Sequence, residues 1–395
     1  MRAFRFACLT YLGVALPGST LGLLWPSARI SLHEPVSALG IFLAVGVAAS
    51  VVASAVTGPL LSKLTVGALV ISGAALVSLA LGAEATTSSF VIFVSCSAVF
   101  SFGFGSLDSA LNAYAAGHFG PRHINWMHAS YGLGATAGPL LVTAMLADAL
   151  TWRWAMGAMC LLEAALTLVL LLTRASWRAV PASPADRPRP RLLATPAARR
   201  SRRASTGATS SALVFSAVET GIESAAGIWG YLFLTIGRGA PHGLAGVAVS
   251  AYWAMMFVGR ALLGPVAERL GARRVLSAAV VGVALSSAVM TVPGSTLLAV
   301  MGMMALGLAA APIFPLLTLT TAERTGTADA NKTTRAVASQ VAASTIGSAA
   351  LPAGIGVVIG ATNATALAPF LLALGIGMCG VYAVMTHLAR QHLAH

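Results

Sequence analysis

The chain has 395 residues, of which 57% are hydrophobic and only 9% are charged. Soluble domains carry roughly 25% charged residues, so this composition excludes a soluble enzyme or a soluble binding module. The formal net charge of +13 would suit a nucleic-acid partner, but the basic residues lie in short segments between long apolar runs. Because the chain also lacks the alternating strand pattern of an outer-membrane barrel, we expect a helical membrane protein with no nucleic-acid partner.

The apolar runs predict about twelve membrane-spanning helices, since each run is about long enough to cross a bilayer. The first run extends beyond the length of a signal peptide and is followed by further spans, so we expect it to be an uncleaved helix. The predicted spans cover residues 5–29, 37–61, 66–83, 88–115, 124–147, 153–173, 212–236, 243–266, 274–293, 296–320, 335–360 and 364–388.

One long polar segment separates the sixth span from the seventh. Residues 174–211 are rich in Arg, Pro, Ala and Ser and lack hydrophobic periodicity, which is typical of a flexible linker. We therefore expect an all-α membrane protein in three parts. These are an N-terminal six-helix bundle over residues 1–173, a basic cytoplasmic linker over 174–211, and a C-terminal six-helix bundle over 212–395.

The basic residues lie almost entirely on one side of the predicted spans. Of the 24 Lys and Arg residues, all but Arg29, Arg153, Arg238 and Arg260 fall on that side, and Arg260 falls within a span. Loops rich in Lys and Arg stay in the cytoplasm. The distribution predicts a multi-pass protein of the inner or plasma membrane with both termini in the cytoplasm.

A short motif occurs twice, after the second and the eighth spans. It runs from Gly58 to Lys63 in the first copy and from Gly264 to Arg274 in the second. The pattern Gly-x-x-x-Asp/Glu-Arg/Lys-x-Gly-x-Arg/Lys-Arg/Lys resembles the signature of the major facilitator superfamily. The first copy departs from it, because Ser62 replaces the acid. The resemblance implies two six-helix bundles with an internal repeat, and a conformational latch formed by Lys63, Glu268, Arg269 and Arg273.

Three further stretches resemble the fucose permease branch of that superfamily, a group of sugar–proton symporters. They cover residues 107–112 in the fourth span, 125–134 in the fifth and 221–231 in the seventh. The first span departs from that branch, because residues 19–26 contain no acid where the sugar permeases carry one before a proline. The resemblance implies symport of a sugar with protons. Because the first-span acid is missing, proton coupling by a mechanism that needs two acids is in doubt.

Asp108 is the main candidate for proton coupling. A carboxylate in the middle of a span costs about 2.5–3.5 kcal/mol on insertion scales, so it normally faces a polar cavity or a partner. Asn112 lies four residues later on the same helix face, and His128 on the fifth span lies at a similar depth. We expect Asp108 to exchange a proton and Asn112 and His128 to contact substrate. A purely structural hydrogen bond is the alternative for each of them.

The seventh span carries a second pair of acids. Glu219 and Glu223 are four residues apart and share a helix face, so together they could hold a proton or a cation. Arg260 on the eighth span is the only base within a span, and we expect it to form a structural ion pair with one of them. Further candidate substrate contacts, with packing between helices or an aromatic belt as their alternative, are Trp229, Trp253 and Gln340.

These features predict a secondary active transporter that moves a small polar solute such as a sugar together with protons, by alternating access. A proton-coupled exporter of drugs or metabolites is the alternative, because Gly134, Gly138 and Pro139 resemble the antiporter motif of that group. Against it, the fourth span lacks the arginine and the first span lacks the aspartate that those exporters carry. A sensor that transports nothing is a further alternative.

The sequence contains no nucleotide-binding loop and no catalytic or metal-binding constellation. We therefore expect no enzymatic activity, no metal and no cofactor, with the proton gradient as the energy source. The expected partners are a small-molecule substrate and the lipid bilayer, and we expect the protein to act as a monomer.

Overall fold

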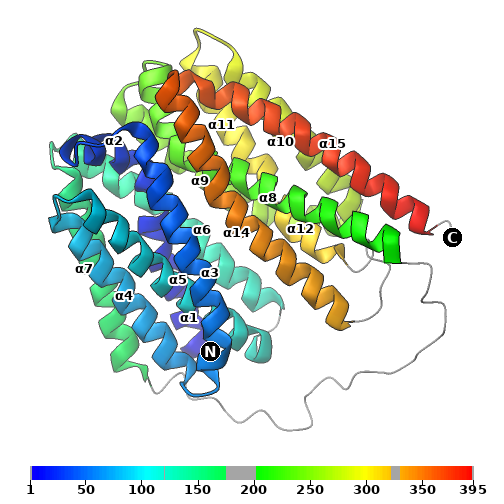
Figure 1. Cartoon of the computed structure of the whole chain (residues 1–395), viewed down its shortest axis with the longest axis horizontal. Coiled ribbons are helices and arrows are strands. Elements are labelled where there is room, and N and C mark those ends of the chain that lie inside the picture. Colours follow the sequence, from blue (N-terminus) through cyan, green and yellow to red (C-terminus); the bar gives the residue numbers. More distant parts are fainter. Residues whose placement is uncertain (1, 120, 175–201, 322–329, 394–395) are drawn as a thin grey trace.

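The computed structural model describes the whole chain except residues 1, 120, 175–201, 322–329 and 394–395. The described residues form long helices joined by short loops, in two series on either side of the linker (Figure 1). The first series contains α1 (Arg2–Gly18), α2 (Leu21–Ser31), η1 (Val36–Ala38), α3 (Leu39–Leu61), α4 (Val66–Thr86), α5 (Phe90–His118), α6 (Pro121–Ala147) and α7 (Trp152–Leu172). The second contains α8 (Arg202–Leu232), η4 (Phe233–Gly237), α9 (His242–Leu270), α10 (Ala272–Thr291), α11 (Thr296–Ala310), α12 (Ile313–Leu319), α14 (Ala330–Ala361), η5 (Ala364–Ala366) and α15 (Leu367–Leu393).

The described helices confirm an all-α membrane fold. Ten segments are long and apolar enough to cross a membrane, and the pair α1 and α2 makes an eleventh span that is bent by 42°. The remaining predicted span, 212–236, corresponds to α8 and η4. This segment is more polar than the other spans because it carries Ser216, Glu219, Thr220 and Glu223.

Two of the predicted spans are broken in the structure, and the end of the predicted linker is helical. The first span divides into α1 and α2, and the span over 296–320 divides into α11 and α12 just before Ile313. Pro312 precedes α12, and proline lacks the N–H that would continue the helical hydrogen-bond ladder. Residues 202–211 of the predicted linker belong to α8, and residues 175–201 lie outside the described part of the chain.

Within each series, glycines let helices touch backbone to backbone. A Cβ atom at Gly134 of α6 would overlap the main-chain oxygen of Leu12 on α1. In the second series, a Cβ atom at Gly347 of α14 would overlap the main-chain oxygen of Ala217 on α8. Small residues at such crossings give close van der Waals packing, which holds helices together in lipid. Each series of helices therefore packs into a tight bundle, which we call the N-half and the C-half.

The two halves join through α2 with α8, α3 with α14 and α6 with α9. We call these contacts the seam. Its close contacts at glycines include Gly22 with Ile228, Gly40 with Ala353, and Thr143 with Gly246. In Figure 1 the halves meet near α2 and diverge towards the chain termini. We call the diverging side, on which α1 begins and α3 ends, the basic side. It carries Lys63 in the loop after α3, and Arg269 and Arg273 at the ends of α9 and α10.

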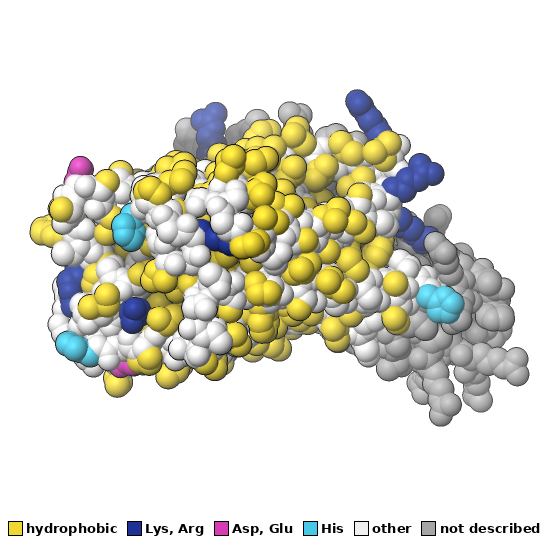
Figure 2. Space-filling view, turned by 90° about the horizontal axis from the view of Figure 1, so that it is seen from above, with side chains coloured by type: hydrophobic (Ala, Val, Ile, Leu, Met, Phe, Trp, Pro, Cys, Tyr) yellow, Lys and Arg dark blue, Asp and Glu magenta, His cyan; other side chains and the backbone are white. Residues whose placement is uncertain are grey.

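The surface of the molecule fits a bilayer. Figure 2 shows a largely apolar face over the middle of the protein, with basic side chains towards both of its ends. Leu79, Val91 and Leu161 are among the large apolar side chains that are mostly exposed. Exposure of such an apolar surface to water would be unfavourable, whereas the hydrocarbon chains of a bilayer can cover it. The charged ends mark where the chain leaves the hydrocarbon region.

Candidate functional site

Asp108 lies in a hydrogen-bonded cluster that joins α1 to α5 within the N-half. The hydroxyl of Tyr11 on α1 donates to Oδ1 of Asp108 at 2.5 Å. The Nδ2 atom of Asn112 donates to the Tyr11 hydroxyl at 3.0 Å and to the main-chain oxygen of Asp108 at 3.0 Å. Tyr11 is only 2% exposed. The acid is therefore held by a buried donor, and Asn112 donates in turn to that donor.

His128 and Tyr131 extend this cluster on α6. The His128 ring lies 5.2 Å from the Tyr11 ring, and the Tyr131 ring lies 6.4 Å from it, measured between ring centres. His128 is exposed and within electrostatic range of Asp108. The structure thus brings together Asp108, Asn112 and His128, as expected for one polar site in the N-half.

The C-half carries a second cluster on α8 and α9. A guanidinium nitrogen of Arg260 lies 3.3 Å from Oε1 of Glu223, and the two form an ion pair. One turn earlier, Glu219 is 2% exposed and accepts a hydrogen bond from Thr220 at 3.0 Å. The Tyr252 hydroxyl donates to the main-chain oxygen of Glu223 at 2.9 Å. The structure thus pairs Arg260 with Glu223, one of the two acids that the sequence offered as its partner.

The two clusters come near each other across the seam. Tyr131 of the N-half lies within electrostatic range of both Glu223 and Arg260, and His128 lies within electrostatic range of Arg260. A solute that reached this point could contact both halves at once. Such a position suits a transport site, because a ligand held by both halves can favour one arrangement of them over another.

Two of the three remaining predicted substrate contacts lie in the helix packing instead. Trp229 is 1% exposed and its Nε1 atom donates to the main-chain oxygen of Pro352 at 2.8 Å, so in this structure it joins α8 to α14 rather than lining a cavity. Gln340 is buried and bonded to the hydroxyl of Thr321 at 3.2 Å, which is the inter-helix contact given above as its alternative. Trp253 is half-buried over Gly227 and stays a candidate.

The predicted latch residues lie at the ends of α3, α9 and α10. Lys63, Glu268 and Arg269 are exposed, and among the described residues they form no ion pair with one another. Arg273 is also exposed. The four side chains therefore lie exposed on the side where the halves diverge (Figure 1), and the latch stays a prediction.

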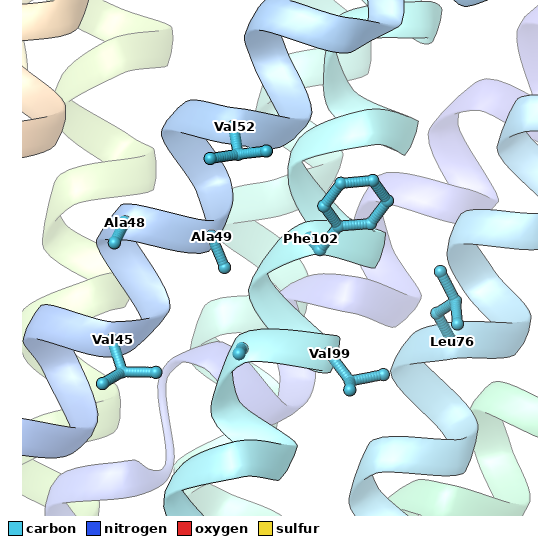
Figure 3. Close-up of a pocket in the computed structure, with 8 residues that line it drawn as sticks. Val45, Ala48, Ala49, Val52, Leu76, Val99 and Phe102 are labelled. Atoms are coloured by element: carbon cyan, nitrogen blue, oxygen red, sulfur yellow. The ribbon is translucent and has the colours of Figure 1, made fainter.

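A cavity of about 580 Å³ lies away from both clusters, among α3, α4 and α5 (Figure 3). Its lining is apolar throughout: Val45, Ala48, Ala49, Val52, Leu76, Ala98, Val99 and Phe102. Val52 and Val99 are 53% and 40% exposed, which places the cavity at the apolar outer surface of the N-half. It offers no partner to a polar solute.

Tyr11 is the member of the Asp108 cluster that the sequence did not single out. A tyrosine inside an apolar run carries a hydroxyl group that needs a hydrogen-bond partner when it is buried. This feature of the sequence could have indicated a polar contact at Tyr11. The partner itself is 97 residues away. Among the described residues, no group of three or more His, Cys, Asp or Glu side chains could hold a metal ion.

The comparisons with known proteins agree with this architecture. Residues 7–352 match the family model described as Major Facilitator Superfamily, whereas no curated protein matches the chain in sequence. A mutant of the nucleoside transporter NupG is similar in structure, with a TM-score of 0.76, 16% identity, and coverage of 96% of this chain and 98% of that one.

Two other transporters share the fold. A mutant of the peptide transporter POT in complex with alafosfalin has a TM-score of 0.75 and 13% identity, over 98% of this chain and 95% of that one. The transporter FucP in the outward conformation has a TM-score of 0.62 and 18% identity, over 98% of both chains. The chain therefore belongs to the Major Facilitator Superfamily, and it is a membrane transporter rather than an enzyme.

Proposed function

We propose that this transporter moves a small polar solute, such as a sugar, together with protons by alternating access. The observation that carries the proposal is the carboxyl group of Asp108, held by Tyr11 at 2.5 Å within a membrane span. An ionisable group at such a depth is usually part of an ion or substrate pathway. Asp108 can take up a proton from one side and release it to the other as the halves rearrange.

The C-half supplies the groups that would respond to the solute. Glu223 pairs with Arg260, and Glu219 lies one turn away with one carboxylate oxygen bonded to Thr220. In the described part of the chain, Oε1 of Glu219 is buried without a hydrogen-bond partner. Such an atom is costly unless a proton or a cation occupies it. We propose that Glu219 and Glu223 share in ion binding while Asp108 carries the coupled proton.

The latch completes the proposed cycle. Lys63, Glu268, Arg269 and Arg273 are charged and exposed on the basic side in the conformation described here. When the halves approach each other on that side, opposite charges in these loops would pair and hold it shut. We further propose that the basic side is cytoplasmic, that the protein resides in the inner or plasma membrane, and that it acts as a monomer.

Relatives of the same fold support a polar solute. The structures similar to this chain include a nucleoside transporter and a peptide transporter. Nucleosides and peptides are both small and polar. Because these transporters are only 16% and 13% identical to this chain, the solute of this protein is to be identified by direct transport assays. A proton-coupled exporter is the second candidate, favoured by the glycines Gly134 and Gly138 that pack α6 tightly against α1.

The deciding experiment uses the purified protein in liposomes with a pH-sensitive dye inside. Solutes are added outside one at a time: sugars, nucleosides, amino acids and hydrophobic cations. Symport predicts acidification of the interior with one solute, and Asp108→Asn should abolish it while leaving the protein folded. Alkalinisation with a hydrophobic cation would identify an exporter. Solute uptake that ignores pH and survives Asp108→Asn would refute the assigned role of the acid.

A further inference from the structure

Two basic side chains, one from each half, lie at the end of the seam nearest the basic side. In this part of the seam, Gly132 of α6 packs against Phe257 of α9, and a Cβ atom at Gly132 would lie 3.1 Å from that of Phe257. One turn further towards the basic side, α6 carries His128 and α9 carries Arg260. Residues three or four apart share a helix face, so both side chains lie on the faces that oppose each other where the halves begin to diverge.

Both side chains have hydrogen-bond donors to spare. A guanidinium group has five N–H donors. Among the described residues Arg260 donates only to Glu223, at 3.3 Å, and its side chain is 31% exposed. That distance exceeds the roughly 2.7–2.9 Å of a strong charge-assisted hydrogen bond. His128 is exposed and has no hydrogen-bond partner among the described residues.

The acids of the site are less accessible than its bases. Glu219 is 2% exposed, and the side chain of Glu223 is 14% exposed against 31% for Arg260. Asp108 already receives the hydroxyl of Tyr11. His128 and Arg260 are therefore more accessible than either glutamate to a solute that enters from the basic side.

We propose that the solute carries a carboxylate, bound between Arg260 of the C-half and His128 of the N-half. This inference rests on the proposed transport function and narrows its substrate class to a hydroxylated organic acid, such as a sugar acid. A carboxylate matches the fork of a guanidinium group with two parallel hydrogen bonds. It would replace Glu223 as the partner of Arg260, and the polar cluster around Asp108 and Asn112 would remain for hydroxyl groups.

The same arrangement would link binding to closure. When the basic side closes, α6 and α9 must approach each other there, which brings His128 towards Arg260. Two like charges, or two unpaired donors, oppose that approach in a site of low dielectric constant. An anion between them removes the opposition and attracts both helices. The bound acid thereby favours the closed arrangement, whereas the empty site does not.

The first test measures counterflow, in which a labelled solute enters liposomes loaded with the same unlabelled solute. Each acid is compared with its own uncharged relative: glucuronate with glucose, glycerate with glycerol and lactate with propane-1,2-diol. We expect at least one acid to exchange about tenfold faster than its relative, a ratio equivalent to about 1.4 kcal/mol. Equal or faster exchange of every neutral relative, fastest exchange of glucosamine, or no exchange of any acid would overturn the proposal.

The second test uses matched variants. Arg260→Gln combined with Glu223→Gln removes both charges of the ion pair and leaves no unpaired carboxylate, and His128→Asn removes the imidazole. Each should raise the KM for the acid by about tenfold with less effect on kcat. Arg5→Gln, which removes an exposed base of α1 outside the site, is the control. An unchanged KM for the acid in both site variants would refute the proposal.

These outcomes separate the two proposals. Counterflow involves no net proton movement, so a failure of proton coupling would leave the preference for acids intact. Conversely, interior acidification by a neutral sugar that depends on Asp108 would support the proton symport and overturn the carboxylate site.

Discussion

The seam predicts that one methyl group can shift the conformational equilibrium. Gly22 of α2 lies directly against the main-chain oxygen of Ile228 on α8, and a Cβ atom there would overlap that oxygen. A backbone oxygen cannot rotate away as a side chain can. In Gly22→Ala the two helices must separate, and such overpacking typically costs about 1–3 kcal/mol.

The cost falls on one conformation only. The described arrangement needs α2 against α8, whereas an arrangement open on that side does not. A penalty of about 1–3 kcal/mol changes the ratio of the two conformations by about 5- to 150-fold. Gly22→Ala should therefore deplete the conformation that is open on the basic side and enrich the opposite one.

Pulsed electron paramagnetic resonance can measure this ratio. Spin labels at Leu64→Cys, after α3, and Leu270→Cys, at the end of α9, lie on exposed positions of opposite halves at the basic side. The native cysteines are first replaced by serine. Gly22→Ala should shift the distance distribution towards shorter values, because the basic side closes.

A matched control tests the reasoning. Gly354→Ala adds the same methyl group to α14, where a Cβ atom would have nothing within 4 Å. Both substitutions raise helix propensity by a similar amount, about 1 kcal/mol. A distance distribution that is unchanged in Gly22→Ala, or that shifts equally in Gly354→Ala, would refute the role of the α2–α8 crossing.

Three further substitutions have separate expected outcomes. Tyr11→Phe removes the donor to Asp108, a charge-assisted bond worth about 1.5–3 kcal/mol, and should slow proton-driven uptake by about tenfold while counterflow changes less. Gln340→Met removes the hydrogen bond to Thr321 and should lower the melting temperature in detergent without changing the KM for solute, because Gln340 is buried between helices. Arg153→Ala leaves two carbonyl oxygens at the end of α4 and in the loop after it without their donor, and should destabilise the protein by about 1–3 kcal/mol in thermal unfolding.

Each of these has its own control. Tyr382→Phe removes an exposed hydroxyl bonded to Ser277 and should leave proton-driven uptake unchanged. A higher KM in Gln340→Met would return that residue to the substrate site. A single nitrogen of Arg153, Nη1, donates to both carbonyl oxygens. Arg153→Met keeps a long side chain but has no donor for them, so full stability of Arg153→Met would contradict the capping role.

Much of this protein was predictable from local sequence. Apolar runs longer than a bilayer is thick dictate helices, because only helices satisfy their own backbone within lipid. Three acids, Asp108, Glu219 and Glu223, also stand out in the sequence. A carboxylate within an apolar run is costly to place in a membrane and therefore usually has a functional role. The duplicated loop motif pointed to the superfamily that the family match confirms. The ion pair of Arg260 was predictable because Arg260 is the only base within a predicted span, next in sequence to the span that carries Glu219 and Glu223.

The tertiary structure decided which groups meet. Tyr11 and Asp108 are 97 residues apart, and only the packing of α1 against α5 and α6 brings the hydroxyl to the carboxyl. Packing within the C-half buries Trp229 against α14 and pairs Gln340 with Thr321, where the sequence left both substrate contact and helix packing open. Hydropathy reports the depth of a residue in the membrane. It does not report the direction in which the residue faces, because that depends on which helix covers it.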